Sequence, residues 1–252
     1  MPTHPAHGLG AHDSPRPRAA RVVFDAIVLA GGAGRRLGPA VAKPEVVVGG
    51  LALVDHALAA VAAARHVVLV APEQHARPGI PRTLEDPPGG GPVAGLAAGL
   101  AHLHTLTTPT LTSRAGGEAP GGGEGARVVV VLACDVPRAA QVVDALVVAA
   151  STPGVDGARL VAADGAPQHL VAAYRTDALV AALAGLDEVR GASMRRALAG
   201  LRLVGIPDPD DVSRDADTWP DVAALDERLG ARPQISTAEP DASAAGRRQD
   251  QP

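Results

Sequence analysis

The sequence predicts an α/β fold in which a mostly parallel sheet carries helices on both faces. Short runs rich in Val and Ile alternate with longer Ala- and Leu-rich segments along most of the chain, which is the pattern of repeated strand–helix units. Hydrophobic residues make up 46% of the 252 residues and charged residues 20%, so the chain can bury a substantial core. Because only 1% of the residues are aromatic, that core must consist of Ala, Val and Leu.

The first expected strand, Arg21–Ala30, is a β-branched apolar run that ends in glycines, as buried parallel strands do. The strongest later run is Arg127–Cys134. Further strands are expected at 66–71, 82–85, 159–163, 169–174 and 203–206, and helices at 51–64, 92–104, 139–150, 176–186, 191–201 and 218–229. Ligands of such sheets bind at the carboxyl ends of the strands, so the loops after the strands are the first place to look for a site.

The composition at the two ends differs from that of the middle. Residues 1–20 are rich in Pro, His and Arg, and residues 231–252 hold Pro, Ser and Gln, so both tails are expected to be disordered. The Thr-, Gly- and Pro-rich segment 105–126 is expected to be a flexible surface insertion. The sequence therefore predicts a single domain over residues 21–230.

Composition excludes several classes of protein. The net charge of −4 argues against a nucleic-acid binder, which needs a basic surface. Cys134 is the only cysteine, which excludes a disulfide framework and a cysteine zinc cluster. No apolar run approaches the ~20 residues that a membrane span needs, and residues 1–20 contain no hydrophobic block of a secretory signal. We therefore expect a cytoplasmic protein without membrane partners.

A glycine-rich loop, Leu29–Gly38, follows the first strand. Glycines such as Gly31 and Gly32 let backbone N–H groups approach a phosphate closely, and Arg35 and Arg36 can neutralise its charge. The loop has no Gly-Lys-Ser/Thr of a Walker A sequence, and Leu37 stands where the dinucleotide-binding fingerprint has its third glycine. An ordinary tight turn is the alternative interpretation of the glycines alone.

Two single residues are candidates for chemistry on a phosphate. Lys43 is the only lysine among 23 basic residues and lies just beyond the glycine-rich loop, where its ammonium could act as a point charge. Asp135 follows the strong strand, where a carboxylate can bind Mg²⁺ together with substrate phosphates. The alternatives are chance placement for Lys43 and helix capping for Asp135.

A third candidate segment is Glu85–Pro92, which leads into a helix N-terminus with free N–H groups. Asp86 in this segment could accept a hydrogen bond from a base or a ribose, and a plain loop is the alternative. The nine histidines show no metal-binding spacing.

Four motifs in order together resemble the molybdenum cofactor guanylyltransferase family and its nucleotidyltransferase relatives. The family's LAGG-x-x-x-R-M-G…D-K loop corresponds to Leu29–Lys43, and its E-D…G-P-L-A-G stretch to Glu85–Gly95. Its C-D-x-P corresponds to Cys134–Pro137, and its N-V-N-T-P-E-D-L to Asp215–Val222. The resemblance covers about residues 21–229 and implies a Rossmann-like, three-layer nucleotidyltransferase fold.

The resemblance also implies roles for individual residues. Backbone groups of Leu29, Ala30 and Gly31 would contact the nucleotide, and Lys43 and Asp86 would also bind GTP. The metal ligands would be Asp135, which would hold Mg²⁺, and Asp217 as a second ligand.

The implied reaction is Mg²⁺-dependent transfer of GMP from GTP to a phosphate acceptor, molybdopterin, with release of pyrophosphate. Because a phosphate is already ionised, catalysis would depend on positioning and charge neutralisation by Lys43, Arg36 and Asp135.

Three departures from the family pattern leave the base and the acceptor open. Ala42 stands where the family has Asp, four residues instead of three separate Gly38 from Lys43, and Val70 stands near the position of a family Asn. Cytidylyl transfer to the pterin, activation of a sugar 1-phosphate with another nucleotide, and a non-catalytic nucleotide-binding accessory protein remain as alternatives. An NAD-dependent oxidoreductase is disfavoured by the broken glycine fingerprint.

Overall fold

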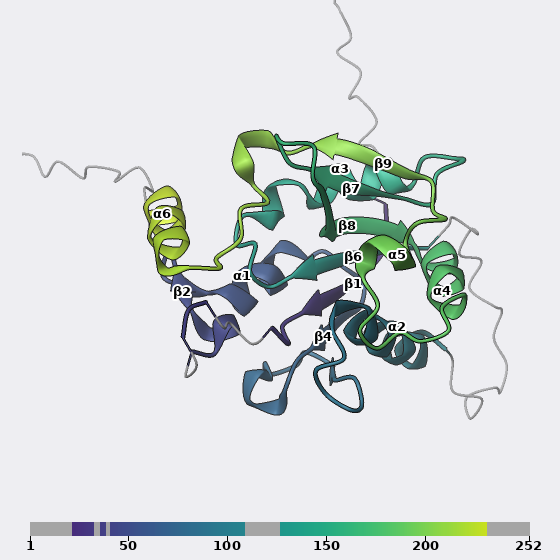
Figure 1. Cartoon of the computed structure of the whole chain (residues 1–252), viewed down its shortest axis with the longest axis horizontal. Helices are drawn as coiled ribbons and strands as arrows, with labels where there is room; N and C mark the ends of the chain where they lie inside the picture. Colours follow the sequence, from purple (N-terminus) through teal and green to yellow (C-terminus); the bar gives the residue numbers. More distant parts are fainter. Residues whose placement is uncertain (1–21, 33–35, 39–40, 109–126, 231–252) are drawn as a thin grey trace, which may run out of the picture.

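The computed structural model describes residues 22–32, 36–38, 41–108 and 127–230. The expected disordered tails, and all but the first four residues of the expected insertion, lie outside these ranges. A seven-stranded sheet in the order β5-β4-β1-β6-β8-β7-β9 forms the centre (Figure 1). Its strands are β1 (Phe24–Leu29), β4 (Val67–Val70), β5 (Arg82–Thr83), β6 (Val128–Ala133), β7 (Gly157–Val161), β8 (Pro167–Arg175) and β9 (Leu203–Pro207).

The sheet is mostly parallel, which confirms the predicted fold class. β1 pairs in parallel with β4 and β6, β4 with β5, and β7 with β9, whereas β8 runs antiparallel to both of its neighbours. The carboxyl ends of β1, β4 and β6 therefore meet at one edge of the sheet, where the beginning of β8 also lies. This edge faces α6 in Figure 1.

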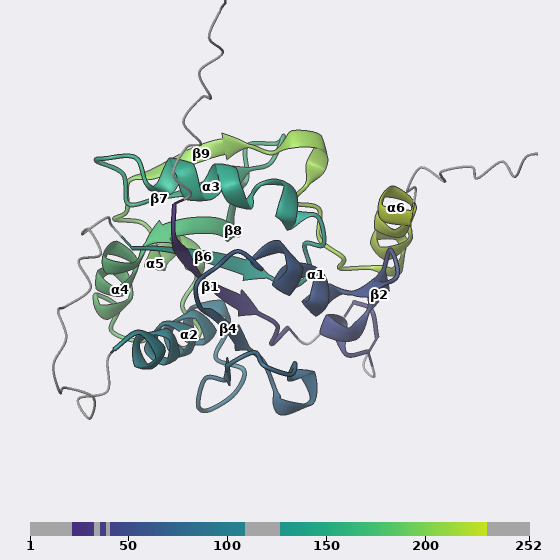
Figure 2. The same cartoon turned by 180° about the vertical axis from the view of Figure 1, so that it is seen from behind.

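Helices cover both faces of the sheet (Figures 1 and 2). On one face, α1 and α3 pack on a core that includes Val28, Leu132 and Leu146. On the other face, α2, α4 and α5 pack on Ile27, Val131 and other buried side chains. Burying each Val or Leu side chain stabilises the fold by about 1.5–3 kcal/mol before entropy is counted. The helices are α1 (Leu53–Ala60), α2 (Pro92–Thr107), α3 (Val143–Ala150), α4 (Thr176–Ala184), α5 (Met194–Ala197) and α6 (Trp219–Gly230).

A small hairpin and the last helix form a third cluster at the carboxyl edge of the sheet. The antiparallel strands β2 (Val47–Val48) and β3 (Leu51–Ala52) are joined by two glycines, and β2 packs against α6. Gly49 has φ +58, and a Cβ there would lie 2.7 Å from Leu229 Cβ, so the turn requires glycine. The sequence analysis missed this hairpin and extended the helix over 51–64, because the Ala-rich run hides the change of conformation at residue 53.

Other boundaries also differ from the predictions. α2 continues to Thr107, so residues 105–107 of the expected flexible segment are helical. The helices expected at 139–150 and 191–201 are shorter, because a 3₁₀ turn, η3 (Ala139–Gln141), precedes α3 and because α5 has only four residues. Within the described part of the chain, no helix is long and apolar enough to cross a membrane.

Candidate active site

A cleft of about 580 Å³ opens at the carboxyl edge of the sheet. Its walls come from the ends of β1, β4 and β6, from the loop before α2 and from the segment before α6. This is the edge at which parallel α/β sheets bind ligands. The residues that line the cleft are Leu29, Gly31, Gly32, Arg36, Lys43, Val70, Glu85, Gly89, Gly91, Pro92, Gly95, Ala133, Cys134, Asp135, Leu170 and Asp217.

Lys43 is the centre of the polar cluster in this cleft. Its Nζ donates to Asp135 Oδ2 at 2.7 Å and to Asp217 Oδ1, although only 9% of the lysine side chain is exposed. Burial disfavours the charged ammonium, but the carboxylates of Asp135 and Asp217 outweigh that effect and raise the pKa of Lys43 above its ordinary value. The structure thus brings together the only lysine and the aspartate after β6, which the sequence singled out separately.

The segment before α6 brings two further carboxylates near Asp135, of which Asp217 lines the cleft and Asp215 is exposed beside it. The backbone N–H of Ala216 donates to the backbone carbonyl of Asp135 at 2.9 Å, which fixes this segment against the end of β6. Asp215 and Asp217 flank that contact. A ligand oxygen from each of Asp135, Asp215 and Asp217 lies within 4.8 Å of the others.

These three carboxylates fit a divalent cation such as Mg²⁺, which prefers oxygen ligands and binds through one or two carboxylates. Partial desolvation and the nearby charges of Asp217 and Asp135 raise the pKa of Asp215, so negative charge is in excess here. The ammonium of Lys43 lies between the carboxylates of Asp135 and Asp217, so the space between these two side chains favours a positive charge. Sequence analysis named Asp135 and Asp217 but missed Asp215. This residue corresponds to the first Asn of the family's N-V-N-T-P-E-D-L motif, two positions before Asp217.

The described residues of the glycine-rich loop, 29–32 and 36–38, contribute another part of the cleft wall. Gly31 and Gly32 are exposed in the cleft, and a Cβ on either would meet no atom within 4 Å, so their backbone is open to a ligand. Arg36 lines the cleft and donates from Nη1 to Asp217 Oδ2 at 2.7 Å. Ala30 is buried, and its backbone N–H donates to the backbone carbonyl of Val70 at 2.8 Å. Arg35 lies outside the described residues.

The loop before α2 brings Glu85, rather than Asp86, into the cleft. Glu85 Oε1 accepts hydrogen bonds from the N–H groups of Gly89 and Gly90, which turn this carboxylate inward. Asp86 is exposed and lines a neighbouring depression with Glu188 and other residues. The nucleotide-binding role of Asp86 stays a prediction, and Glu85 is the acid of this pair that lines the cleft.

The thiol of Cys134 and the aromatic side chains are the remaining candidates for chemistry or stacking. Burial, together with the charge of Asp135, raises the pKa of Cys134 to about 12, so the thiol stays protonated, in agreement with its interpretation as a small core residue. Tyr174 and Phe24 are buried in the core. Trp219 is 54% exposed, and its indole N–H donates to the backbone carbonyl of Leu37 at 3.0 Å.

The mostly parallel sheet, the exposed Gly31 and Gly32 and the lysine–carboxylate cluster at the carboxyl edge define a Rossmann-like α/β protein with a cleft for an anionic ligand. The MobA-like NTP transferase domain family matches residues 26–204, and the chain belongs to this family. The protein is therefore a nucleotide-binding transferase. Among curated proteins, no sequence matches the chain significantly.

Solved structures share this fold at low sequence identity. Molybdopterin-guanine dinucleotide biosynthesis protein A from Archaeoglobus fulgidus is 23% identical, with 81% of this chain and 98% of that chain covered and a TM-score of 0.56. The homologue of Mycobacterium tuberculosis Rv0371c from Mycobacterium sp. strain JC1 is 20% identical, covers 82% of this chain and 96% of that chain, and has a TM-score of 0.56. The 4-diphosphocytidyl-2C-methyl-D-erythritol synthase from Anaerococcus prevotii is 12% identical, covers 82% of this chain and 96% of that chain, and has a TM-score of 0.53.

Proposed function

We propose that this enzyme transfers GMP from GTP to the terminal phosphate of molybdopterin and releases pyrophosphate. A phosphate oxygen of the acceptor attacks the α-phosphorus of GTP, and the bond from that phosphorus to the bridging oxygen of pyrophosphate breaks. The observation that carries the proposal is the convergence of Lys43, Asp135 and Asp217 in a cleft that the exposed Gly31 and Gly32 also line. The similarity to the Archaeoglobus fulgidus protein supports this choice of nucleotide and acceptor.

The chain itself supplies positioning and positive charge for two anionic substrates. Backbone groups of Leu29, Gly31 and Gly32 would hold the triphosphate, with Arg36 beside its β and γ phosphates. Lys43 would offset charge at the α-phosphate. Because the acceptor phosphate is already ionised, no general base is required, and preorganised electrostatics account for most of the rate enhancement.

A Mg²⁺ ion would be held by Asp135 and Asp217, with Asp215 beside them. When bound, the ion would screen the repulsion between the two phosphates. Lys43 donates to both of these carboxylates and partly neutralises their charge. Lys43, Arg36 and Asp135 would be the catalytic residues. We expect the reaction to occur in the cytoplasm.

A cytidylyl transfer to the same pterin is the second candidate. Val70 lines the cleft at the end of β4 and offers no hydrogen-bonding side chain where the family has Asn, so this wall does not select guanine. The synthase from Anaerococcus prevotii, whose name contains a diphosphocytidyl product, has the same fold. Activation of a sugar 1-phosphate would use the same loop and carboxylates.

The test is release of pyrophosphate from GTP, CTP, ATP and UTP, each with Mg²⁺ and with or without molybdopterin. We expect GTP to be turned over at least about 10-fold faster than the others, and only with the acceptor; that ratio corresponds to about 1.4 kcal/mol. An Asp135→Asn variant serves as the inactive control. Faster release from CTP would select the second candidate, and tight GTP binding without release would indicate a non-catalytic accessory protein.

A further inference from the structure

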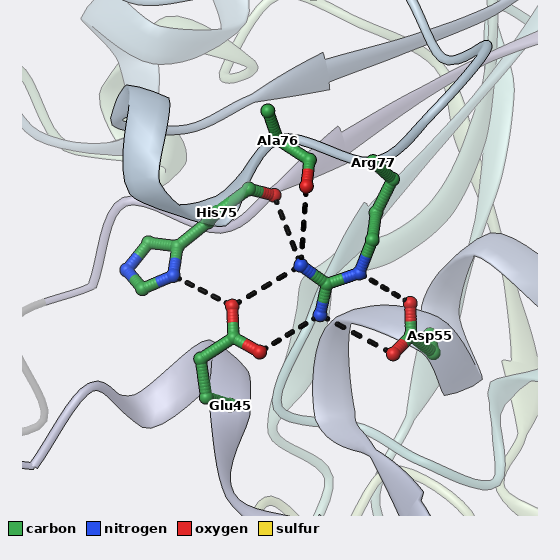
Figure 3. Close-up of polar contacts among 5 residues, drawn as sticks. All are labelled: Glu45, Asp55, His75, Ala76 and Arg77. Carbon is green, nitrogen blue, oxygen red and sulfur yellow. Dashed lines mark hydrogen bonds and ion pairs between the residues drawn. The ribbon is translucent and has the colours of Figure 1, made fainter.

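A network of four ionisable side chains lies outside the lining of the cleft, and none of them was assigned a role in the reaction described above. Figure 3 shows its centre, Arg77, whose guanidinium donates from all three nitrogens. Nε and Nη2 bind Asp55 at 2.6 and 3.2 Å, while Nη1 and Nη2 bind Glu45 at 3.2 and 2.8 Å. Nη1 also donates to the backbone carbonyls of His75 and Ala76 at 3.4 and 3.3 Å.

The network joins three separate segments of the chain. Glu45 ends the 3₁₀ turn η1 (Lys43–Glu45), Asp55 lies in the first turn of α1, and Arg77 follows the 3₁₀ turn η2 (Glu73–His75). His75, which is only 6% exposed, adds a contact from Nδ1 to Glu45 Oε1 at 2.8 Å. Arg77 is 20% exposed, so its ion pairs are partly shielded from solvent.

The turn that Arg77 holds is the one that carries the catalytic lysine. Lys43 is its first residue and Glu45 its third, and the N–H of Val46 closes the turn by donating to the carbonyl of Lys43 at 3.1 Å. A shift of Glu45 would therefore move the backbone of Lys43. Bidentate arginine–carboxylate pairs fix orientation as well as distance, which a single lysine contact would not.

We propose that Arg77 is a positioning residue: through Glu45 and Asp55 it fixes the η1 turn against α1, so that the ammonium of Lys43 stays between Asp135 and Asp217. Arg77 is absent from the cleft lining and would not touch the substrate. The kinetic part of this inference rests on the proposed function, whereas the placement of Lys43 can be measured without any reaction.

The experiment compares Arg77→Gln with Arg202→Gln. Arg202 is a matched control because it also forms a two-nitrogen contact with one carboxylate, Asp156, at 3.1 and 3.0 Å, but it is 69% exposed and does not line the cleft. We expect Arg77→Gln to lower kcat about 30-fold with KM for the nucleotide changed less than about 3-fold, since small misplacements of a catalytic group can cost about 10²-fold. Arg202→Gln should keep the wild-type kcat.

A second readout uses the fact that Lys43 is the only lysine in the chain. Protein labelled with ¹³C at the lysine Cε gives one lysine signal, displaced from the position of an exposed lysine in the wild type and in Arg202→Gln. In Arg77→Gln we expect that signal to move to the exposed position. If it stays at the wild-type position, the proposal is overturned, whether or not the enzyme uses GTP and molybdopterin.

Two further variants separate positioning from loss of folding and from charge. Glu45→Gln keeps the Arg77–Asp55 contact, and we expect it to fold and to shift the lysine signal in the same direction as Arg77→Gln. Arg77→Lys keeps the positive charge but not the bidentate guanidinium contacts. We expect it to recover less than half of the kcat that Arg77→Gln loses. Full activity in Arg77→Lys, or a lysine signal in Glu45→Gln identical to that of the wild type, would overturn the proposal.

Discussion

The two edges of the central sheet both bury an ionisable side chain, but with opposite charge balance. At the amino edge, Asp25 at the start of β1 is 3% exposed and lies near three basic side chains. His66 Nδ1 is 2.8 Å from its Oδ1, Arg65 Nε is 3.5 Å from the same atom, and Arg127 Nη2 is 3.4 Å from Oδ2. At the carboxyl edge, Lys43 is the buried group, and acids surround it.

This difference in charge balance distinguishes a cluster that only stabilises the fold from a candidate ligand-binding site. At the amino edge the acid has a surplus of cations around it, so its charge is compensated within the chain. Among the described residues of the carboxyl edge, Asp135, Asp215 and Asp217 outnumber the cations Lys43 and Arg36, and the cluster opens into a large cleft. Uncompensated like charges beside a cleft are unfavourable until a ligand arrives, which is why such arrangements mark functional sites.

The comparison predicts the largest effect for Asp135→Ala. We expect kcat to fall about 10³-fold or more, since each 1.36 kcal/mol of lost transition-state stabilisation costs about 10-fold. Binding of GTP in the absence of Mg²⁺, measured by calorimetry, should persist. Full turnover of this variant with Mg²⁺ would show that Asp135 has no role in catalysis.

Substitution of Lys43 should have the next largest effect. Lys43→Ala leaves Asp135 and Asp217 unneutralised and removes positive charge near the α-phosphate, so we expect kcat to fall about 10²-fold. Lys43→Arg should rescue only part of the loss, because a planar fork cannot replace a compact ammonium. Wild-type kinetics of Lys43→Ala in a pyrophosphate-release assay would show that Lys43 has no catalytic role and lies there by chance.

At the amino edge, Asp25→Ala should affect stability and not catalysis. Loss of hydrogen bonds to a buried charge costs about 1.5–3 kcal/mol, and this decrease in the free energy of unfolding can be measured with urea. At saturating substrate, kcat of the folded variant should stay within about 2-fold of the wild type. A large loss of kcat would show that the two edges of the sheet are coupled.

The smallest predicted effect concerns pH and the Arg77 network. The hydrogen bond from Arg77, assisted by His75, holds the pKa of Glu45 below its ordinary value of 4.5. A carboxyl with a lowered pKa in the folded state stabilises the fold above its ordinary pKa, and this contribution is lost as the pH falls through the lowered value. The stability difference between wild type and Arg77→Gln should therefore shrink between about pH 5 and pH 3. Because 39% of the Glu45 side chain is exposed, we expect the Glu45 contribution to stay below about 1 kcal/mol. Urea midpoints at both pH values test this, and a difference that grows with acidity would contradict it.

The sequence alone predicted those features of the fold and of the site that a single residue or a short local pattern identifies. Apolar runs identified β1 and β6, and a loop of glycines after β1 together with an aspartate after β6 identified the two walls of the cleft. Lys43 stood out because it is the only lysine. The Gly49–Gly50 pair between two apolar runs is a hairpin signal that could have revealed β2 and β3.

Other features depend on tertiary contacts that no local pattern encodes. Glu85 and Asp86 are neighbouring acids, and only the N–H groups of Gly89 and Gly90 decide that Glu85 turns into the cleft. The partners of Arg77 are 32 and 22 positions away, at Glu45 and Asp55. Single-sequence reading weighs residue types and spacing along the chain, so contacts of this kind come only from the folded structure.

The ion pair between Lys43 and Asp217 spans 174 positions of the chain. During translation, the strands β1 to β9 leave the ribosome before Asp217 does, and domains begin to fold as they emerge. A nascent polypeptide can thus assemble most of its sheet while the acid cluster is still incomplete. Transfer activity should therefore appear only after the segment that carries Asp217 has been synthesised and has joined the sheet.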